Sequence, residues 1–221
     1  MIVFFSGNTF LMNFHISQIL RSGLLGLLLT LITGPLAQAT TVIPPEFEEL
    51  ATRSDYVVRG RVVATNAEIR IKGSGKKIFT RVEVEVLEVI QGTPPVQLIL
   101  ECLGGRVGDE ELIVGGAPSF VVGEESILFV SGNGRALCPL YAMSYGFYPI
   151  KDEGATKRRY VARGNQVPLE NVAEIAQPLL EGDAAEAQRR GKRAALALSP
   201  DDFAQKIKSV VRAKSTRATN N

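Results

Sequence analysis

The stretch that decides the fold is Thr80-Arg81-Val82-Glu83-Val84-Glu85-Val86, in which Thr80 and three valines alternate with charged residues. Because successive side chains of a β-strand point to opposite faces, this alternation predicts a strand with one buried and one exposed face. After Val86 the alternation slips by one position, so that Leu87 and Val89 become the apolar residues. An extra residue in one strand of a pair produces such a slip, and we therefore predict a β-bulge there.

Other strand-like runs surround this one and are bounded by glycine or proline turns. The run at 56–63 is rich in β-branched residues, and Gly60 inside it indicates a bulge or sharp bend. A polar connection at 68–77, with a flexible glycine-containing tip, joins that run to the alternating strand. Since no long helix separates the strands, the pattern predicts a mainly β protein with a barrel or sandwich core. Later strands are predicted at 96–102, 126–130 and 145–150, with an edge ribbon at 159–162.

Helical signals flank this β region. Pro44 and Pro45 precede Glu46 to Ser54, in which the apolar residues share one face, and this predicts a short N-terminal helix. Near the C-terminus, 183–198 is helix-prone although Gly191 interrupts it. Ser199-Pro200 is a strong helix start, and the following apolar residues recur every three or four positions. We expect this apolar face to pack on the chain's own β core rather than on a membrane or a partner.

The first forty residues have the layout of a secretory signal. Arg21 precedes an apolar run at 24–32, Gly34-Pro35 breaks the run, and Ala37-Gln38-Ala39 follows. The run is much shorter than the roughly 20 residues that a membrane-spanning helix needs, so an uncleaved anchor is the less favoured alternative. We predict an exported protein, periplasmic or secreted, with no stable membrane span after cleavage. The expected organisation is a signal peptide at 1–39, a β-barrel domain at 40–165 and a helical segment at 166–221.

Composition excludes several kinds of chemistry. The chain has 25 Lys and Arg against 23 Asp and Glu, a nearly neutral balance that argues against a nucleic-acid surface. Basic residues collect toward the C-terminus, where a solvated helical tail explains them. The single histidine, His15, lies in the predicted signal. Without another histidine, a Ser-His-Asp or Cys-His site and the usual zinc, copper or haem ligation are not expected. We predict no cofactor and no metal.

The two cysteines, Cys102 and Cys138, would meet an oxidising compartment after export. A single structural disulfide is the natural prediction, and two free buried thiols are the alternative. A redox-active pair is less favoured because the C-x-x-C spacing is absent.

Three segments together resemble a known family. They are 54–62 (SDYVVRGRV), 78–92 (IFTRVEVEVLEVIQG) and 122–130 (VGEESILFV). They resemble the netrin-like modules typified by tissue inhibitors of metalloproteinases, and exported bacterial proteins of unknown function carry a similar pattern. The resemblance covers about 47–150 and implies a five-stranded OB-like Greek-key barrel.

One departure from that family concerns function. Its metalloproteinase inhibitors chelate the active-site zinc through an N-terminal cysteine, whereas this chain has Thr40 and Thr41 there and no cysteine before Cys102. Inhibition by that mechanism is therefore not expected, and a shared fold does not fix a function.

The preferred functional surface is the long glycine-rich stretch at 104–123, referred to below as the excursion. Long loops on a rigid scaffold often bind partners, and this one would present Arg106, Asp109, Glu110 and Phe120. The glycines could instead serve only tight packing. We predict a non-enzymatic module that binds a protein or an envelope component through these barrel loops.

Two other functions stay open. The first is a carboxylate-dependent hydrolase acting outside the cytoplasm, which needs two acids from separate strands to converge in a deep pocket. The acids Asp109-Glu110-Glu111 and Glu124-Glu125 are available, although we interpret them as solvated loop charges. The second is a structural or assembly factor, whose sign would be a large exposed apolar patch on the helix at 203–211. The aromatic residues at 141–148 could form a stacking platform, but core packing is the preferred interpretation.

Overall fold

A long antiparallel ribbon organises the sheet. In the computed structural model, which describes residues 42–72, 75–154 and 156–219, β1 (Tyr56–Lys72) pairs with β2 (Gly75–Gly92) along its whole length. The predicted strands are confirmed, and the two strands of the ribbon are longer than expected, because 68–72 and 75–77 belong to the ribbon and not to a polar loop. The predicted signal peptide lies outside the described residues, all of which fall within one compact unit, Thr41–Asn221.

The ribbon contains the predicted irregularities. Register shifts leave Leu87 and Ile90 of β2 without a residue opposite them in β1, and Val63 of β1 without one in β2. The slip after Val86 is therefore a bulge, as the sequence indicated. The shift that leaves Leu87 unpaired falls between Arg59 and Gly60, and a Cβ atom on Gly60 would lie 2.4 Å from Val84 Cγ1. Only glycine allows so close an approach of the two strands.

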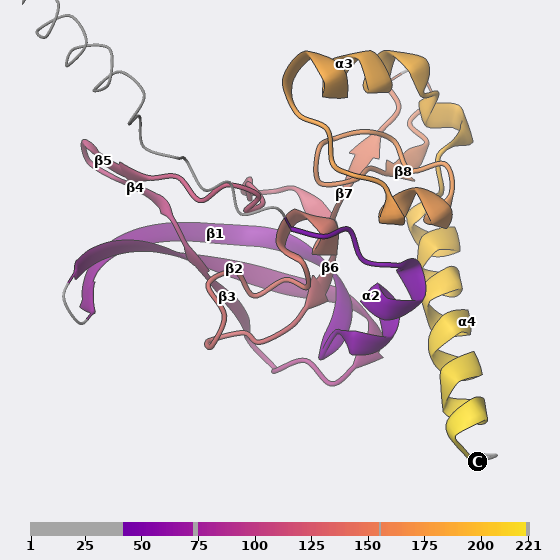
Figure 1. Cartoon of the computed structure of the whole chain (residues 1–221), viewed down its shortest axis with the longest axis horizontal. Helices are drawn as coiled ribbons and strands as arrows, with labels where there is room; N and C mark the ends of the chain where they lie inside the picture. Colours follow the sequence, from indigo (N-terminus) through magenta and orange to yellow (C-terminus); the bar gives the residue numbers. More distant parts are fainter. Residues whose placement is uncertain (1–41, 73–74, 155, 220–221) are drawn as a thin grey trace, which may run out of the picture. The chain divides into compact units, whose positions relative to one another are not determined.

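Six strands form one antiparallel sheet in the order β3-β2-β1-β6-β7-β8 (Figure 1). The excursion contributes a separate two-stranded sheet, β4-β5, which the sequence did not indicate. The remaining strands are β3 (Leu98–Leu103), β4 (Gly105–Val107), β5 (Glu110–Leu112), β6 (Glu125–Val130), β7 (Phe147–Asp152) and β8 (Arg159–Val161).

The expected closed barrel is not formed among the described residues. Closure requires the edge strand β3 to pair with a strand at the other end of the sheet, and no such pairing occurs there. The loop at 131–138 lies along β3 instead. Leu103 N–H donates to Leu137 O at 2.7 Å, and Asn133 Nδ2 donates to Ile99 O at 2.8 Å. The chain is thus a mixed structure with an open sheet, because this loop uses the edge that closure would need.

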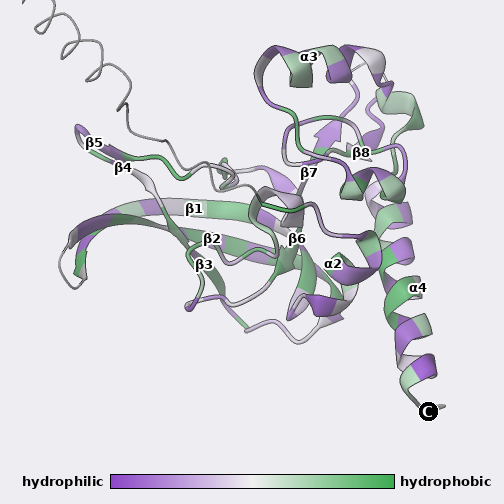
Figure 2. Cartoon of the chain, viewed as in Figure 1, coloured by the Kyte–Doolittle hydropathy of each residue, from purple (hydrophilic) through white to green (hydrophobic). Residues whose placement is uncertain are grey.

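Two apolar clusters cover the two faces of the sheet. Successive side chains of a strand point to opposite faces, so neighbouring residues belong to different clusters. Ile127 and Tyr148 belong to one cluster, and Leu128 and Phe147 belong to the other. The cluster with Ile127 also contains the buried side chains of the terminal helices, α2 (Phe47–Arg53) and α4 (Pro200–Thr219). Figure 2 shows how apolar and polar residues alternate along these elements.

The C-terminal helix α4 begins with a cap. Ser199 Oγ accepts a hydrogen bond from Asp202 N–H at 3.1 Å and donates one to the Asp202 carboxylate at 2.6 Å. Phe203 and Ile207 are fully buried against the sheet and α2, so the expectation that this helix docks on its own core is confirmed. Among the described residues no helix is long and apolar enough to cross a membrane. The other helices are α3 (Gly182–Gly191), η1 (Met143–Gly146), η2 (Val172–Ala176) and η3 (Ala194–Leu196).

Candidate functional site

The excursion is fixed to the sheet at its start. Gly104 N–H donates to Ile78 O at 2.8 Å, and the Thr80 hydroxyl donates to Gly104 O at 2.7 Å. Gly105 follows with a φ of 129°, and a Cβ on it would lie 2.2 Å from Thr80 Oγ1. The two glycines are therefore required by close packing, and they set the direction in which the β4-β5 hairpin leaves the sheet.

Three of the four predicted surface residues lie exposed on this hairpin. Arg106 is on β4, Asp109 is in the turn and Glu110 begins β5. Arg106 Nε donates to Gly108 O at 3.2 Å, and Glu110 forms an ion pair with Lys76 near the tip of the β1-β2 ribbon. The hairpin thus presents charges of both signs, and the Lys76 ion pair fastens it to the ribbon.

The fourth predicted residue, Phe120, does not join them on the surface. Its ring packs edge-on against Phe147, with the ring centroids 5.2 Å apart, and it lies against the core cluster on that face. Phe120 therefore anchors the far end of the excursion, and its interpretation as a binding residue is not supported by its position.

Exposed valines lie where sequence reasoning did not look for a site. Val121 and Val122, just after Phe120, have 51% and 56% of their surface exposed, and the bulged Val63 has 48%. Hydrogen bonds from Gly123 N–H to Val62 O at 2.8 Å and from Val62 N–H to Glu124 O at 3.0 Å hold the two segments together. We name Val63, Val121 and Val122 the apolar corner.

Val121 and Val122 of the apolar corner belong to the same stretch of chain as the charged hairpin, whereas Val63 belongs to β1. Ile113, directly after β5, is 80% exposed, and Figure 2 shows hydrophobic residues following the hairpin. A clue was present in the sequence, because the excursion contains apolar residues that match neither a helical nor a strand period. The exposure of Val63 could not be read, because it depends on the register of β1 against β2.

Glu124 and Glu125, two of the acids considered for a hydrolase, are already paired with basic residues. Glu124 accepts from Lys151 Nζ at 2.6 Å, and Glu125 forms ion pairs with Arg59, Arg61 and Arg159. Burial raises the pKa of Glu125, but the hydrogen bonds from Arg159 and Arg61 outweigh it and lower that pKa to about 2. A carboxylate held ionised in this way cannot act as a general acid near neutral pH.

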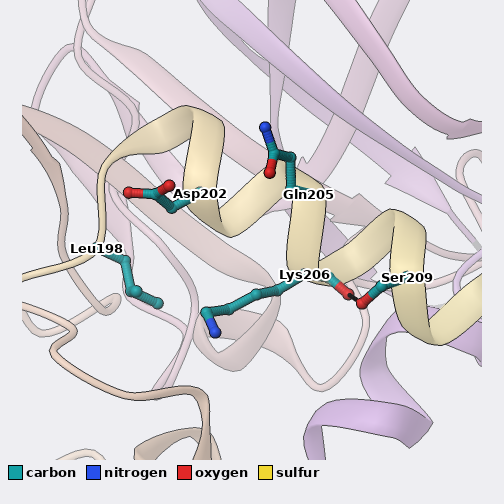
Figure 3. A pocket seen from close by; sticks show the side chains of 5 residues that line it. All are labelled: Leu198, Asp202, Gln205, Lys206 and Ser209. Atoms are coloured by element: carbon teal, nitrogen blue, oxygen red, sulfur yellow. Dashed lines mark hydrogen bonds between the residues drawn. The ribbon is translucent and has the colours of Figure 1, made fainter.

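Two shallow hollows in the described surface also lack a carboxylate pair. The first lies along α4 and is lined by Asp202 as its only acid (Figure 3). In Figure 3 its side chains come from α4 and from Leu198, two residues before that helix, so no strand contributes. The second hollow, beside Pro44 and Pro45, has Glu49 as its only acid. The described residues contain no group of three or more metal-ligating side chains.

The cysteines are close together but not bonded. Cys102 on β3 and Cys138 in the adjacent loop are both buried free thiols, so the predicted disulfide is absent from this structure. Cys102 donates a hydrogen bond to Cys138, which lowers the pKa of Cys138 despite its burial. Leu140 N–H assists the same shift. The fold thus brings the predicted partners into contact in their reduced form.

Arg163 is a buried charge that the sequence did not reveal. Arg163 has only 1% of its surface exposed. Its Nη2 donates a hydrogen bond to Gln177 O, whereas its Nη1 has no hydrogen-bond partner within the described protein. Burial lowers the pKa of this arginine. Arg163 holds the turn after β8 against the segment at 172–180, and nothing at this position suggests contact with an external ligand.

The four aromatic residues considered as a stacking platform mostly serve the core. Phe147 and Tyr148 are buried on opposite faces of the sheet, while Tyr141 and Tyr145 are partly buried. Tyr141 donates to Glu49 at 2.8 Å, and the Tyr145 hydroxyl accepts from Leu179 N–H at 3.2 Å. Since the four rings do not share one exposed face, core packing accounts for them.

Comparison with known proteins adds no identification. No protein-family model matches the chain, and no curated protein matches it.

Proposed function

We propose that this chain is an exported, non-enzymatic binding module that contacts a protein or an envelope component through its excursion. The observation that carries the proposal is the apolar corner. Val121 and Val122, near the end of the anchored excursion, and Val63 on β1 are each about half exposed, and backbone hydrogen bonds hold their two segments together. Adjacent exposed apolar side chains beside polar groups are typical of interaction sites.

The charged hairpin complements this corner. Arg106, Asp109 and Glu110 are exposed and would form a polar rim that selects the orientation of a partner. Anchoring at Gly104 and at Phe120 supports the proposal further, because a pre-ordered surface loses less conformational entropy on binding.

The other functions receive less support. The hydrolase would need two free acids in a pocket, and Glu124 and Glu125 are both paired. An assembly factor acting through α4 would need its apolar face exposed, whereas Phe203 and Ile207 lie in the core.

We further propose that the sheet is a partly open relative of the OB-type barrel. Strands β1, β2, β3, β6 and β7 fall where five barrel strands were expected, and the segments that resemble netrin-like modules lie mainly on β1, β2 and β6. Backbone nuclear Overhauser contacts that reproduce the order β3-β2-β1-β6-β7, with the loop at 131–138 beside β3, would support this relation. A different strand order in solution would contradict it.

The binding proposal is tested by capture from an extracytoplasmic extract. The baits are the wild-type protein, the variant Arg106→Ala/Val122→Ser and the control Val96→Ser, in which a fully exposed valine outside the excursion is changed. We expect wild type and control to retain the same partner and the double variant to lose it. Retention by all three baits would contradict the proposed surface.

A further inference from the structure

About half of β1 has one edge whose backbone groups pair with no other described strand. It pairs with β2 throughout, but β6 covers only Tyr56–Arg61, and the segment at 123–124 covers only Val62. From Ala64 to Ile71 the side of β1 that faces away from β2 has no backbone hydrogen bond to the rest of the described chain. Figure 1 shows the β1-β2 ribbon extending past the end of β6.

The direction of the free backbone groups follows from one hydrogen bond. Ile78 O on β2 accepts from Gly104 N–H at 2.8 Å, so this carbonyl points away from β1. Ile69 lies opposite Ile78, and the two therefore form a pair of the non-hydrogen-bonded type. The N–H and C=O groups of Ile69 consequently point to the free edge. By the strand period of two, those of Ala67 and Ile71 do so as well.

An exposed edge of this kind is a template for another strand, and this one is complementary to itself. If a second copy runs antiparallel with Ile69 opposite Ile69, then Ala67 lies opposite Ile71 and Glu68 lies opposite Arg70. Apolar residues then meet on one face and opposite charges meet twice on the other. Centring the pairing one residue away would instead place Glu68 against Glu68 or Arg70 against Arg70, so charge selects one register.

In the single chain the charged groups lie on one face of the ribbon, where Arg70 also lies over the Phe79 ring of β2. Arg70 Nε donates to Glu68 at 2.6 Å within the chain, and Arg70 also pairs with Glu101 at 2.8 Å. All three side chains are partly exposed, so an incoming strand can share these ion pairs without exposing buried charge.

We propose that two copies of this chain associate through the Ala64–Ile71 edge of β1, around a twofold axis at Ile69. The two ribbons then form a continuous β2-β1-β1-β2 sheet. Such an interface is isologous, since each copy offers the same strand. This association goes beyond the binding function proposed above and uses different side chains, so either can fail while the other stands.

The test compares sedimentation velocity over a range of protein concentrations for wild type, Glu68→Arg, Arg70→Glu and the double variant. We expect a concentration-dependent dimer for wild type, a dimer weakened about tenfold by each single reversal, and recovery in the double reversal. A wild type that stays monomeric, single variants that dimerise as well as wild type, or a double variant that fails to recover would overturn the proposal.

Disulfide cross-linking provides a second test of the same interface that does not depend on changing charges. Ile69→Cys places a thiol on the twofold axis, whereas Thr65→Cys places one on the same edge but away from its own counterpart. Mild oxidation should link Ile69→Cys into disulfide-bonded dimers and leave Thr65→Cys largely unlinked. Equal linking of the two variants, or linking of neither, would contradict the register.

Discussion

Three guanidinium groups converge on one carboxylate at Glu125, and this arrangement joins separate parts of the fold. Arg61 Nη2 lies 2.7 Å from Glu125, and Arg159 from β8 contacts its other oxygen. Arg59 links the same cluster to Asp201, in the first turn of α4, at 3.3 Å. The side chain of Glu125 is only 13% exposed, so removing it would leave partly buried positive charge unbalanced.

Glu125→Gln should therefore lower the free energy of unfolding at neutral pH by about 2–3 kcal/mol. The pKa of Glu125 falls from its ordinary value of 4.5 to about 2 on folding. Its stabilisation is therefore present above pH 4.5 and is lost as the pH falls toward 2. Urea unfolding between pH 2 and 7 measures this, and the variant should show a weaker acid dependence than wild type.

The matched control is Glu124→Gln, because Glu124 forms an ion pair with Lys151 alone among the described basic residues and is more exposed than Glu125. Its loss should stay below about 1 kcal/mol. Equal losses of unfolding free energy in the two variants would show that the arginine cluster stabilises the fold no more than a single exposed ion pair does.

The cysteine pair gives a second prediction at the scale of residues. Export would expose Cys102 and Cys138 to disulfide-donating oxidants, and the thiol of Cys138, whose pKa is lowered, is the better nucleophile of the two. We expect protein recovered from the export compartment to contain no titratable thiol after unfolding without reductant. Two titratable thiols would contradict this prediction.

At the scale of elements, the excursion depends on Gly105. Gly105→Ala puts a Cβ into Thr80 Oγ1 and forces an alanine to a φ of 129°, so we expect a loss of about 1–3 kcal/mol. Faster hydrogen exchange at Gly104 N–H would show that the hairpin has come away from the ribbon. Gly108→Ala is the control, because its positive φ is milder and no atom lies in the way. Exchange as slow as wild type in Gly105→Ala would contradict the proposed anchor.

The docking of α4 is tested by Phe203→Ala. The Phe203 ring lies 5.0 Å from the ring of Tyr148 and 6.0 Å from that of Phe129, measured between centroids. Removing it should cost about 3–5 kcal/mol. Gln205→Ala, on the exposed side of the same helix, should cost little. Thermal unfolding compares the two variants, and similar midpoints would mean that α4 does not contribute to the core.

The elements differ in how far sequence could predict them. The strands were readable because alternation from Thr80 to Val86 reports burial directly, and the α4 cap was readable from Ser199-Pro200. The open sheet was not, because hydrogen bonds between β3 and the loop at 131–138 depend on contacts distant in sequence. The charged residues of the candidate site could be read from the sequence of the excursion itself. The apolar corner could not, because the exposure of Val63 depends on the register of β1 against β2.

At the scale of the whole molecule, a two-faced sheet carries helices on one face and an anchored, partly apolar excursion beside its long ribbon. The acids considered for hydrolysis stabilise the fold by pairing with basic residues or lie exposed on the hairpin. The exposed charges of the hairpin lie on the same excursion as Val121 and Val122 of the apolar corner. This division is the physical basis for proposing a binding module.

The most direct test is site-specific photo-cross-linking in the exporting cell. A photoreactive side chain replaces Val122 in the apolar corner or, as control, the more exposed Val96 between β2 and β3. The proposed function predicts one dominant adduct from position 122 that is absent from position 96. No adduct at 122, or the same adducts from both positions, would contradict the claim that the excursion is the binding surface.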